Sequence, residues 1–127
     1  MSIQSLIARV TGDTFLSGGA TISLAGDVPT VGYAVGGYSE SKVLNRPTMI
    51  EFGPELADYI ERSPLLTLHG HYLGTWLDGA TGNVWLDVIK VHSTLAVAMQ
   101  EAEQRGELAI YDLAAQQEIR LDVPAAA

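Results

Sequence analysis

The sequence of 127 residues contains no cysteine. Disulfides, thiolate nucleophiles, iron–sulfur clusters and cysteine-ligated zinc are therefore excluded, and such a chain suits a reducing cytoplasm. Long apolar runs are also missing, because no segment approaches the ~18 uninterrupted apolar residues of a membrane span. The first residues lack the basic start and apolar stretch of a secretory signal. These absences predict a cytoplasmic protein that does not contact a membrane.

Basic residues are scarce, with seven Lys and Arg against fifteen Asp and Glu, which gives a formal net charge of −8. Nucleic acids and anionic lipids are bound through Lys and Arg, so direct binding of either is not expected. The excess acid could serve solubility alone, attract a basic partner, or mimic nucleic acid. Mimicry is the weaker alternative, because the carboxylates are scattered among predicted turns and helix exteriors.

An apolar fraction of 47% and a charged fraction of 17% are typical of a globular protein. The length predicts a single domain over residues 1–123, followed by a frayed tail at 124–127. Alternation of apolar and polar residues predicts the strands, beginning with an N-terminal hairpin on either side of a turn at residues 17–19. Polar residues 38–46 are predicted to form a loop. The expected strands cover residues 6–10, 20–24, 30–35, 65–77, 84–89, 108–113 and 119–123.

Two short helices are predicted between these strands. The first begins at Gly53-Pro54 and ends at Ser63-Pro64, and the second begins after Ser93 or Thr94 and ends at Gly106. The sequence thus indicates an α+β fold, with a mainly antiparallel sheet built from hairpins and the two helices packed on it. A hairpin at the C-terminus leaves an edge strand, through which two copies could pair as a homodimer.

Few residues form a pattern that indicates chemistry. The glycines at 32–37 do not match the spacing of a phosphate-binding loop. His69 and His71 lie two apart, so in a strand their imidazoles could share a metal ion, with a third ligand from His92, Asp78 or Asp87. No diagnostic metal-binding spacing is present, and partly exposed strand histidines are the favoured interpretation.

Asp87 follows Trp85 and precedes Ile89 on one strand face, where apolar neighbours can raise the pKa of a carboxyl. It could act as a general acid or base, but no nucleophile and base form a recognisable set with it. The sequence therefore predicts neither an enzyme nor a cofactor. The alternative is a small-ligand-binding or metal-binding, enzyme-like domain that uses His69, His71 and Asp87.

Aromatic residues gather in the predicted hairpin at 72–89. Tyr72 and Trp76 share one face of their strand, and Trp85 joins them from the partner strand. Such a cluster is either covered by a helix or forms an interaction patch, where Trp and Tyr are typical anchors. Covering by the helix that contains Leu95 and Met99 is the favoured interpretation. The candidate partner-binding residues are Tyr72, Trp76, Trp85 and, in the polar loop, Tyr38.

The C-terminal half carries a resemblance. The segments GTWLD, TGNVWLDVIKV and GELAIYDL, with EIR after them, resemble a set of small uncharacterised proteins from actinobacteria and their phages and mobile elements. Trp85 stands where that set usually has Tyr, and Ile89 where a small polar residue is usual. The resemblance implies a small accessory protein made in a bacterial cell, and it implies no established activity. The resulting hypothesis is an acidic cytoplasmic protein that binds and modulates a protein partner.

Overall fold

A computed structural model describes residues 1–121, and its centre is a seven-stranded antiparallel sheet, which confirms the predicted α+β class. The strands follow the order β1-β4-β5-β2-β6-β7, and β3 pairs with β5 beside β2. The predicted tail at 124–127 and the end of the last predicted strand lie outside the described residues. The strands are β1 (Gly19–Ile22), β2 (Tyr33–Val35), β3 (Lys42–Leu44), β4 (His71–Leu77), β5 (Val84–His92), β6 (Ala109–Asp112) and β7 (Gln117–Arg120).

The predicted N-terminal hairpin is wrong, because its first half is the helix α1 (Ile3–Ser17). The side chain of Ser2 caps this helix by accepting from the N–H of Ser5 at 3.1 Å. Gly18 ends it in the left-handed conformation, with φ of 93°, so the glycines form a helix stop rather than a hairpin turn. Residues 6–10 alternate as in a strand, but the buried residues Leu6, Val10 and Thr14 are spaced by four, which is typical of a helix.

The helix α2 (Met49–Glu61) begins four residues before the predicted start. Thr48 and Glu51 form a capping box, in which Thr48 Oγ1 accepts from the N–H of Glu51 at 3.1 Å and Glu51 Oε1 accepts from the N–H of Thr48 at 3.0 Å. Pro54 therefore lies inside the helix and not at its first position. Gly53-Pro54 fits a helix start by residue type, but the capping box of Thr48 and Glu51 begins the helix about one turn earlier.

The hairpin, helix and hairpin predicted for the C-terminal half are confirmed. β4 and β5 pair along seven residues, α3 (Leu95–Gln104) follows the cap Thr94, and β6 pairs with β7. The predicted loop at 38–46 contains the strand β3. The predicted strand at 65–77 begins with a 3₁₀ helix, η1 (Pro64–Thr67). With α1, the described residues hold three α-helices where two were predicted.

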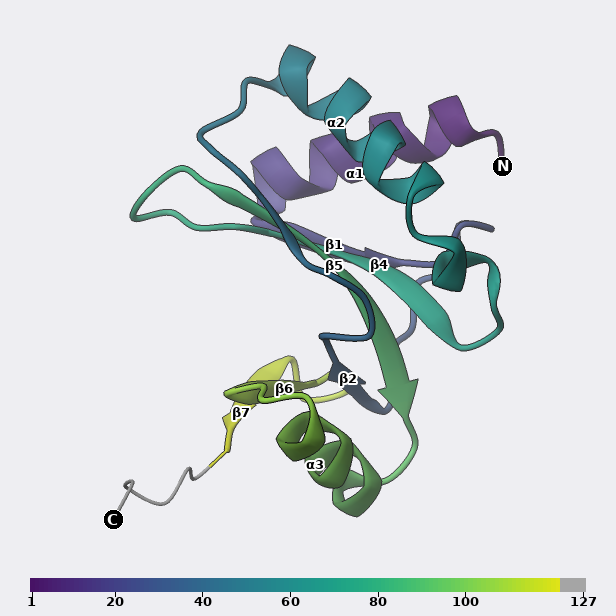
Figure 1. Cartoon of the computed structure of the whole chain (residues 1–127), viewed down its shortest axis with the longest axis vertical. Helices are drawn as coiled ribbons and strands as arrows, with labels where there is room; N and C mark the ends of the chain where they lie inside the picture. Colours follow the sequence, from purple (N-terminus) through teal and green to yellow (C-terminus); the bar gives the residue numbers. More distant parts are fainter. Residues whose placement is uncertain (122–127) are drawn as a thin grey trace.

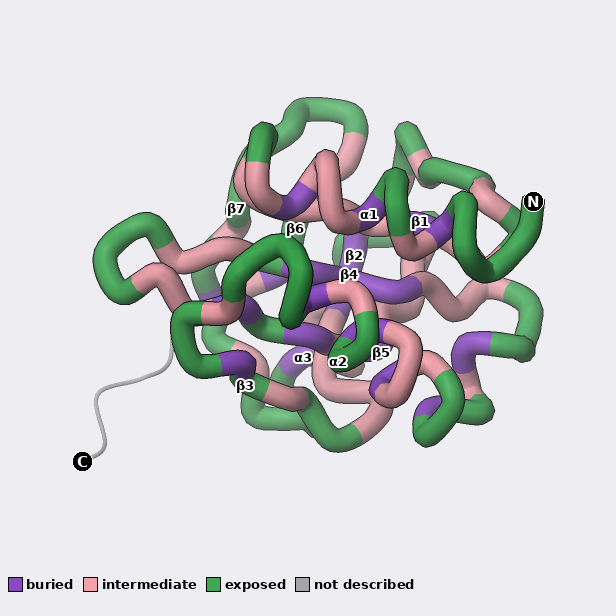
Figure 2. The backbone as a smooth tube through the Cα atoms, turned by 90° about the horizontal axis from the view of Figure 1, so that it is seen from above, coloured by how far each residue is buried: buried purple, intermediate pink, exposed green. Residues whose placement is uncertain are grey.

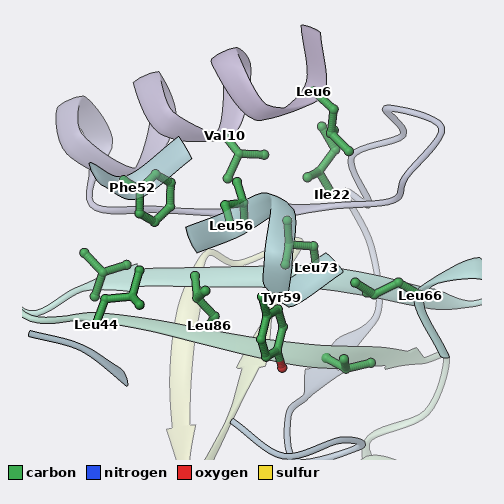
Figure 3. Packing of buried hydrophobic residues seen from close by; sticks show 12 residues of the cluster. Leu6, Val10, Ile22, Leu44, Phe52, Leu56, Tyr59, Leu66, Leu73 and Leu86 are labelled. Carbon is green, nitrogen blue, oxygen red and sulfur yellow. The ribbon is translucent and has the colours of Figure 1, made fainter. Parts of the chain in front are cut away.

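The larger hydrophobic core lies between the sheet and the helices α1 and α2 (Figure 3). Phe52 and Leu56 of α2 point toward the sheet, where Leu73 of β4 and Leu86 of β5 meet them. All four are fully buried. Burial of each side chain of this size contributes about 1.5–3 kcal/mol to folding.

The smaller core lies beneath α3 and joins Val35 and Ile110 to Ala98 and Ala102 of the helix. Val35 pairs with Lys90 of β5, two residues beyond Val88 of the larger core, so both cores lie on the same side of the sheet. In Figure 1, α1 and α2 lie above β1 and β4, while β5 bends downward toward β2, β6 and α3. Figure 2 shows the buried positions concentrated along the central strands beneath the helices.

Candidate interaction surface on the open face of the sheet

The other side of the sheet carries no helix among residues 1–121, and we call it the open face. It is defined by alternate residues of β4, β5 and β6, whose neighbours in each strand point into the cores. Its residues include Tyr72, Gly74, Trp76, Trp85, Asp87, Ile89, Ala109 and Tyr111.

Trp76 and Trp85 are directly opposite each other in the β4–β5 pair. Their exposed fractions are 55% and 42%, so the predicted covering of these rings by the second helix is wrong. That helix, α3, packs on β2, β5 and β6 from the opposite side, where Val35 provides its apolar contact. Their side chains therefore project from neighbouring positions on the same face, and we call these two exposed residues the aromatic pair.

A hollow of about 510 Å³ lies beside the aromatic pair. Gly74 lies at the floor of the hollow, where the side chain of Ile89 from the neighbouring strand packs over it. A Cβ at position 74 would overlap Cδ1 of Ile89. Leu108, which is 59% exposed, closes the hollow from the side of β6. The lining residues that matter for chemistry are Trp76, Trp85, Asp87 and Glu107.

Asp87 is held by backbone donors at the edge of the hollow. Its Oδ2 accepts from the N–H of Gly37 at 3.0 Å, and its Oδ1 accepts from the N–H of Val88 at 2.8 Å. Burial raises the pKa of the Asp87 carboxyl above its ordinary value, and these N–H groups oppose that shift. Asp87 therefore fixes the loop between β2 and β3 as well as facing the hollow.

Glu107 is the second carboxylate of the hollow, and no sequence pattern indicated it. A Cβ on Gly36 would lie 2.8 Å from Glu107 Oε1 and would overlap Asp87 Oδ2, so both carboxylates are adjacent to this glycine. Burial, and after it the charge of Asp87, raises the pKa of Glu107. No ion pair within residues 1–121 includes either carboxylate. The hollow thus holds two carboxyl groups that no Lys or Arg of the described residues pairs with.

Tyr38 lies apart from the tryptophans. Its hydroxyl is 2.7 Å from Nε2 of His92, and the guanidinium of Arg105 lies 3.7 Å from the centre of its ring. Burial raises the pKa of Tyr38 and lowers that of His92, on which Lys90 acts in the same direction. These contacts join the loop after β2 to β5 and α3, which is a structural role. The four candidate partner-binding residues are therefore not one cluster.

Tyr72 is half-buried and lies on the same strand face as Trp76, with Gly74 between them. It lines a different hollow, of about 410 Å³, together with His69 and His71. Nδ1 of His71 is 3.1 Å from the carbonyl oxygen of His69, so its ring turns back toward the segment that precedes β4. Only Trp76 and Trp85 of the predicted set line the hollow.

The proposed metal ligands do not meet in the described part of the chain. Within residues 1–121, no three His, Asp or Glu side chains converge in a way that could hold a metal ion. His92 contacts Tyr38, while Asp87 is bound to backbone N–H groups at the hollow. The predicted set of His69, His71 and Asp87 is thus divided between separate places, and the geometry offers no support for a site that uses all three.

No helix in residues 1–121 combines the length and the apolar character that crossing a membrane requires. The fold is that of an α+β protein whose helices cover one face of a curved antiparallel sheet. The chain matches no protein-family model, no curated protein and no solved structure.

Proposed function

We propose that this chain is an accessory protein that binds another protein through the open face of its sheet. The observation that carries the proposal is the exposed pair of Trp76 and Trp85 beside a hollow. Tryptophan is enriched among the residues that contribute most to protein–protein binding, because a large ring buries much surface at little entropic cost. The exposed side chains of Leu108 and Tyr111 extend the apolar area toward β6.

The charge of the chain favours a basic partner surface. The net charge is −8, and Asp87 and Glu107 place two carboxylates next to the aromatic pair. Opposite charge on a partner would speed association and align the two surfaces. Pairing of two copies through the open face is disfavoured, because it would bring these carboxylates and two charges of −8 together.

The resemblance of the C-terminal half to small proteins of actinobacteria, phages and mobile elements supports a bacterial setting. In that setting the partner is a host or phage protein whose activity the chain inhibits or modulates. The segments that carry the resemblance form β4, β5, β6 and β7, and they include both tryptophans.

A capture experiment with matched variants tests the proposal. The wild-type chain, a Trp76→Ser/Trp85→Ser variant and an Ile50→Ser variant would be immobilised and exposed to an actinobacterial lysate. Ile50 is 89% exposed in α2, on the helical side, so its substitution removes apolar surface elsewhere. A protein captured by the wild type would then be purified and titrated calorimetrically against all three.

We expect the double tryptophan variant to lose at least about 2 kcal/mol of binding free energy, as removal of such anchors does. Ile50→Ser should bind as the wild type does, and added salt should weaken binding because charges attract the partner. Equal affinity of wild type and tryptophan variant, or weakening only by Ile50→Ser, would refute the open face as the docking surface.

A further inference from the structure

We infer that the hollow on the open face binds the guanidinium group of an arginine side chain presented by the partner. This inference deepens the proposed function and depends on it. The hollow provides two aromatic rings, Trp76 and Trp85, and two carboxylates, Asp87 and Glu107, which are the groups that recognise an organic cation.

The first argument is the charge left without compensation. Five of the seven Lys and Arg residues form ion pairs, and all of their partners lie outside the hollow. Glu107 is half-buried, and no hydrogen bond to its side chain occurs within residues 1–121. Burial, and after it repulsion by Asp87, raises the pKa of Glu107. A cation at this place would relieve that repulsion.

The second argument is that Asp87 is already oriented. The N–H groups of Gly37 and Val88 hold its two oxygens, so its carboxylate loses little freedom when a ligand arrives. Gly36 has no side chain that would separate the two carboxylates, and a methyl group there would overlap Asp87. A planar guanidinium, with donors arranged as a fork, can bond to carboxylates on two sides.

The third argument concerns the walls. Trp76 and Trp85 present indole rings, on which a guanidinium stacks favourably, and Ile89 and Ala109 offer apolar contact for the methylene stem. A volume of about 510 Å³ accommodates such a side chain with room for its backbone to remain outside. A bare metal ion fits poorly, because the described residues offer no set of three ligands.

The test uses small probes on the complete chain. The chain has two tryptophans, so its NMR spectrum contains two indole N–H signals, both from the open face. Titration with N-acetyl-arginine methylamide should shift both signals. The citrulline analogue, which has the same shape without the charge, should bind about tenfold more weakly, because it cannot form charge-assisted hydrogen bonds with Asp87 and Glu107.

Two matched variants complete the test. Glu107→Gln removes one charge from the hollow, and Glu103→Gln removes one charge from an exposed position of α3. We expect Glu107→Gln to weaken binding of the arginine probe several-fold and Glu103→Gln to leave it unchanged. Equal binding of the two probes, an absence of shifts with the arginine probe, or equal effects of the two variants would overturn the inference.

The arginine site can be wrong while the proposed docking surface is right, and the variants distinguish the two cases. If the partner loses affinity for Trp76→Ser/Trp85→Ser but binds Glu107→Gln as well as the wild type, the open face docks the partner and the hollow receives no arginine. If the tryptophan variant keeps full affinity, the proposed docking surface itself is wrong.

Discussion

The two faces of the β4–β5 hairpin differ sharply, although they are made by alternate residues of the same strands. On the covered face, Leu73, Leu86 and Val88 are fully buried beneath helices. On the open face, Trp76 and Trp85 keep about half of their surface exposed. The covered face stabilises the fold, while the open face offers large rings at little cost to stability. A regular alternation can thus separate folding from binding within one hairpin.

Adjacent residues provide the largest contrast. Leu86→Ala should lower the free energy of unfolding by about 2–5 kcal/mol, because it leaves a cavity beneath α2. Trp85→Ala, one position earlier on the open face, should cost far less, since its ring is already partly in water. Chemical denaturation of both variants measures the difference. Similar losses would show that the tryptophan face is also a folding core.

The covered face also contains a polar pair, formed by Thr14 of α1 and Thr75 of β4. Their hydroxyl oxygens are 2.6 Å apart and fully buried or nearly so. Thr75→Val leaves the Thr14 hydroxyl without this partner and should cost about 1–3 kcal/mol. The double variant Thr14→Val/Thr75→Val should recover part of that loss, because both polar groups are gone. Additive losses in a double-mutant cycle would contradict this coupling.

The smallest effect is expected from Glu107 on the open face. Because burial and Asp87 raise its folded-state pKa above the ordinary 4.5, the folded protein binds this proton more strongly than the unfolded chain does. Its contribution to stability is therefore gained as the pH falls through the raised pKa and lost as the pH rises. When the pH falls from 7 to 5, the free energy of unfolding of the wild type should rise slightly relative to that of Glu107→Gln.

The gain should stay below about 1 kcal/mol, because Glu107 is partly exposed and solvent screens its charge. Urea denaturation at both pH values measures it, with Glu103→Gln as the control for the loss of one negative charge. If the stability of the wild type relative to Glu107→Gln changes with pH no more than its stability relative to Glu103→Gln, Glu107 has no special environment in the folded protein.

The sequence predicted the C-terminal half best, because every signal there is local. Alternation, the cap at Thr94 and the stop at Gly106 all act within a few residues. The N-terminal helix was missed because five residues of alternation also fit one face of a helix. Its buried residues repeat every four positions from Leu6 to Thr14, and a longer window would have favoured the helix.

The candidate site was only half accessible to sequence reasoning. Alternation places Trp76, Trp85 and Asp87 on one face, and the structure agrees. Whether α3 covers that face depends on which side of the sheet it crosses, and the chain after β5 gives no local signal for this. Glu107 joins Asp87 only because β6 returns beside β2, a contact between residues 20 positions apart that no motif marks.

Hydroxyl-radical footprinting of the chain with its captured partner tests the central claim most directly. Trp76 and Trp85 report on the open face, and Met49 and Ile50 report on the exposed start of α2. We expect partner binding to protect both tryptophans from oxidation and to leave the α2 residues as reactive as in the free chain. Protection of α2 with unchanged oxidation of the tryptophans would contradict the open face as the binding surface.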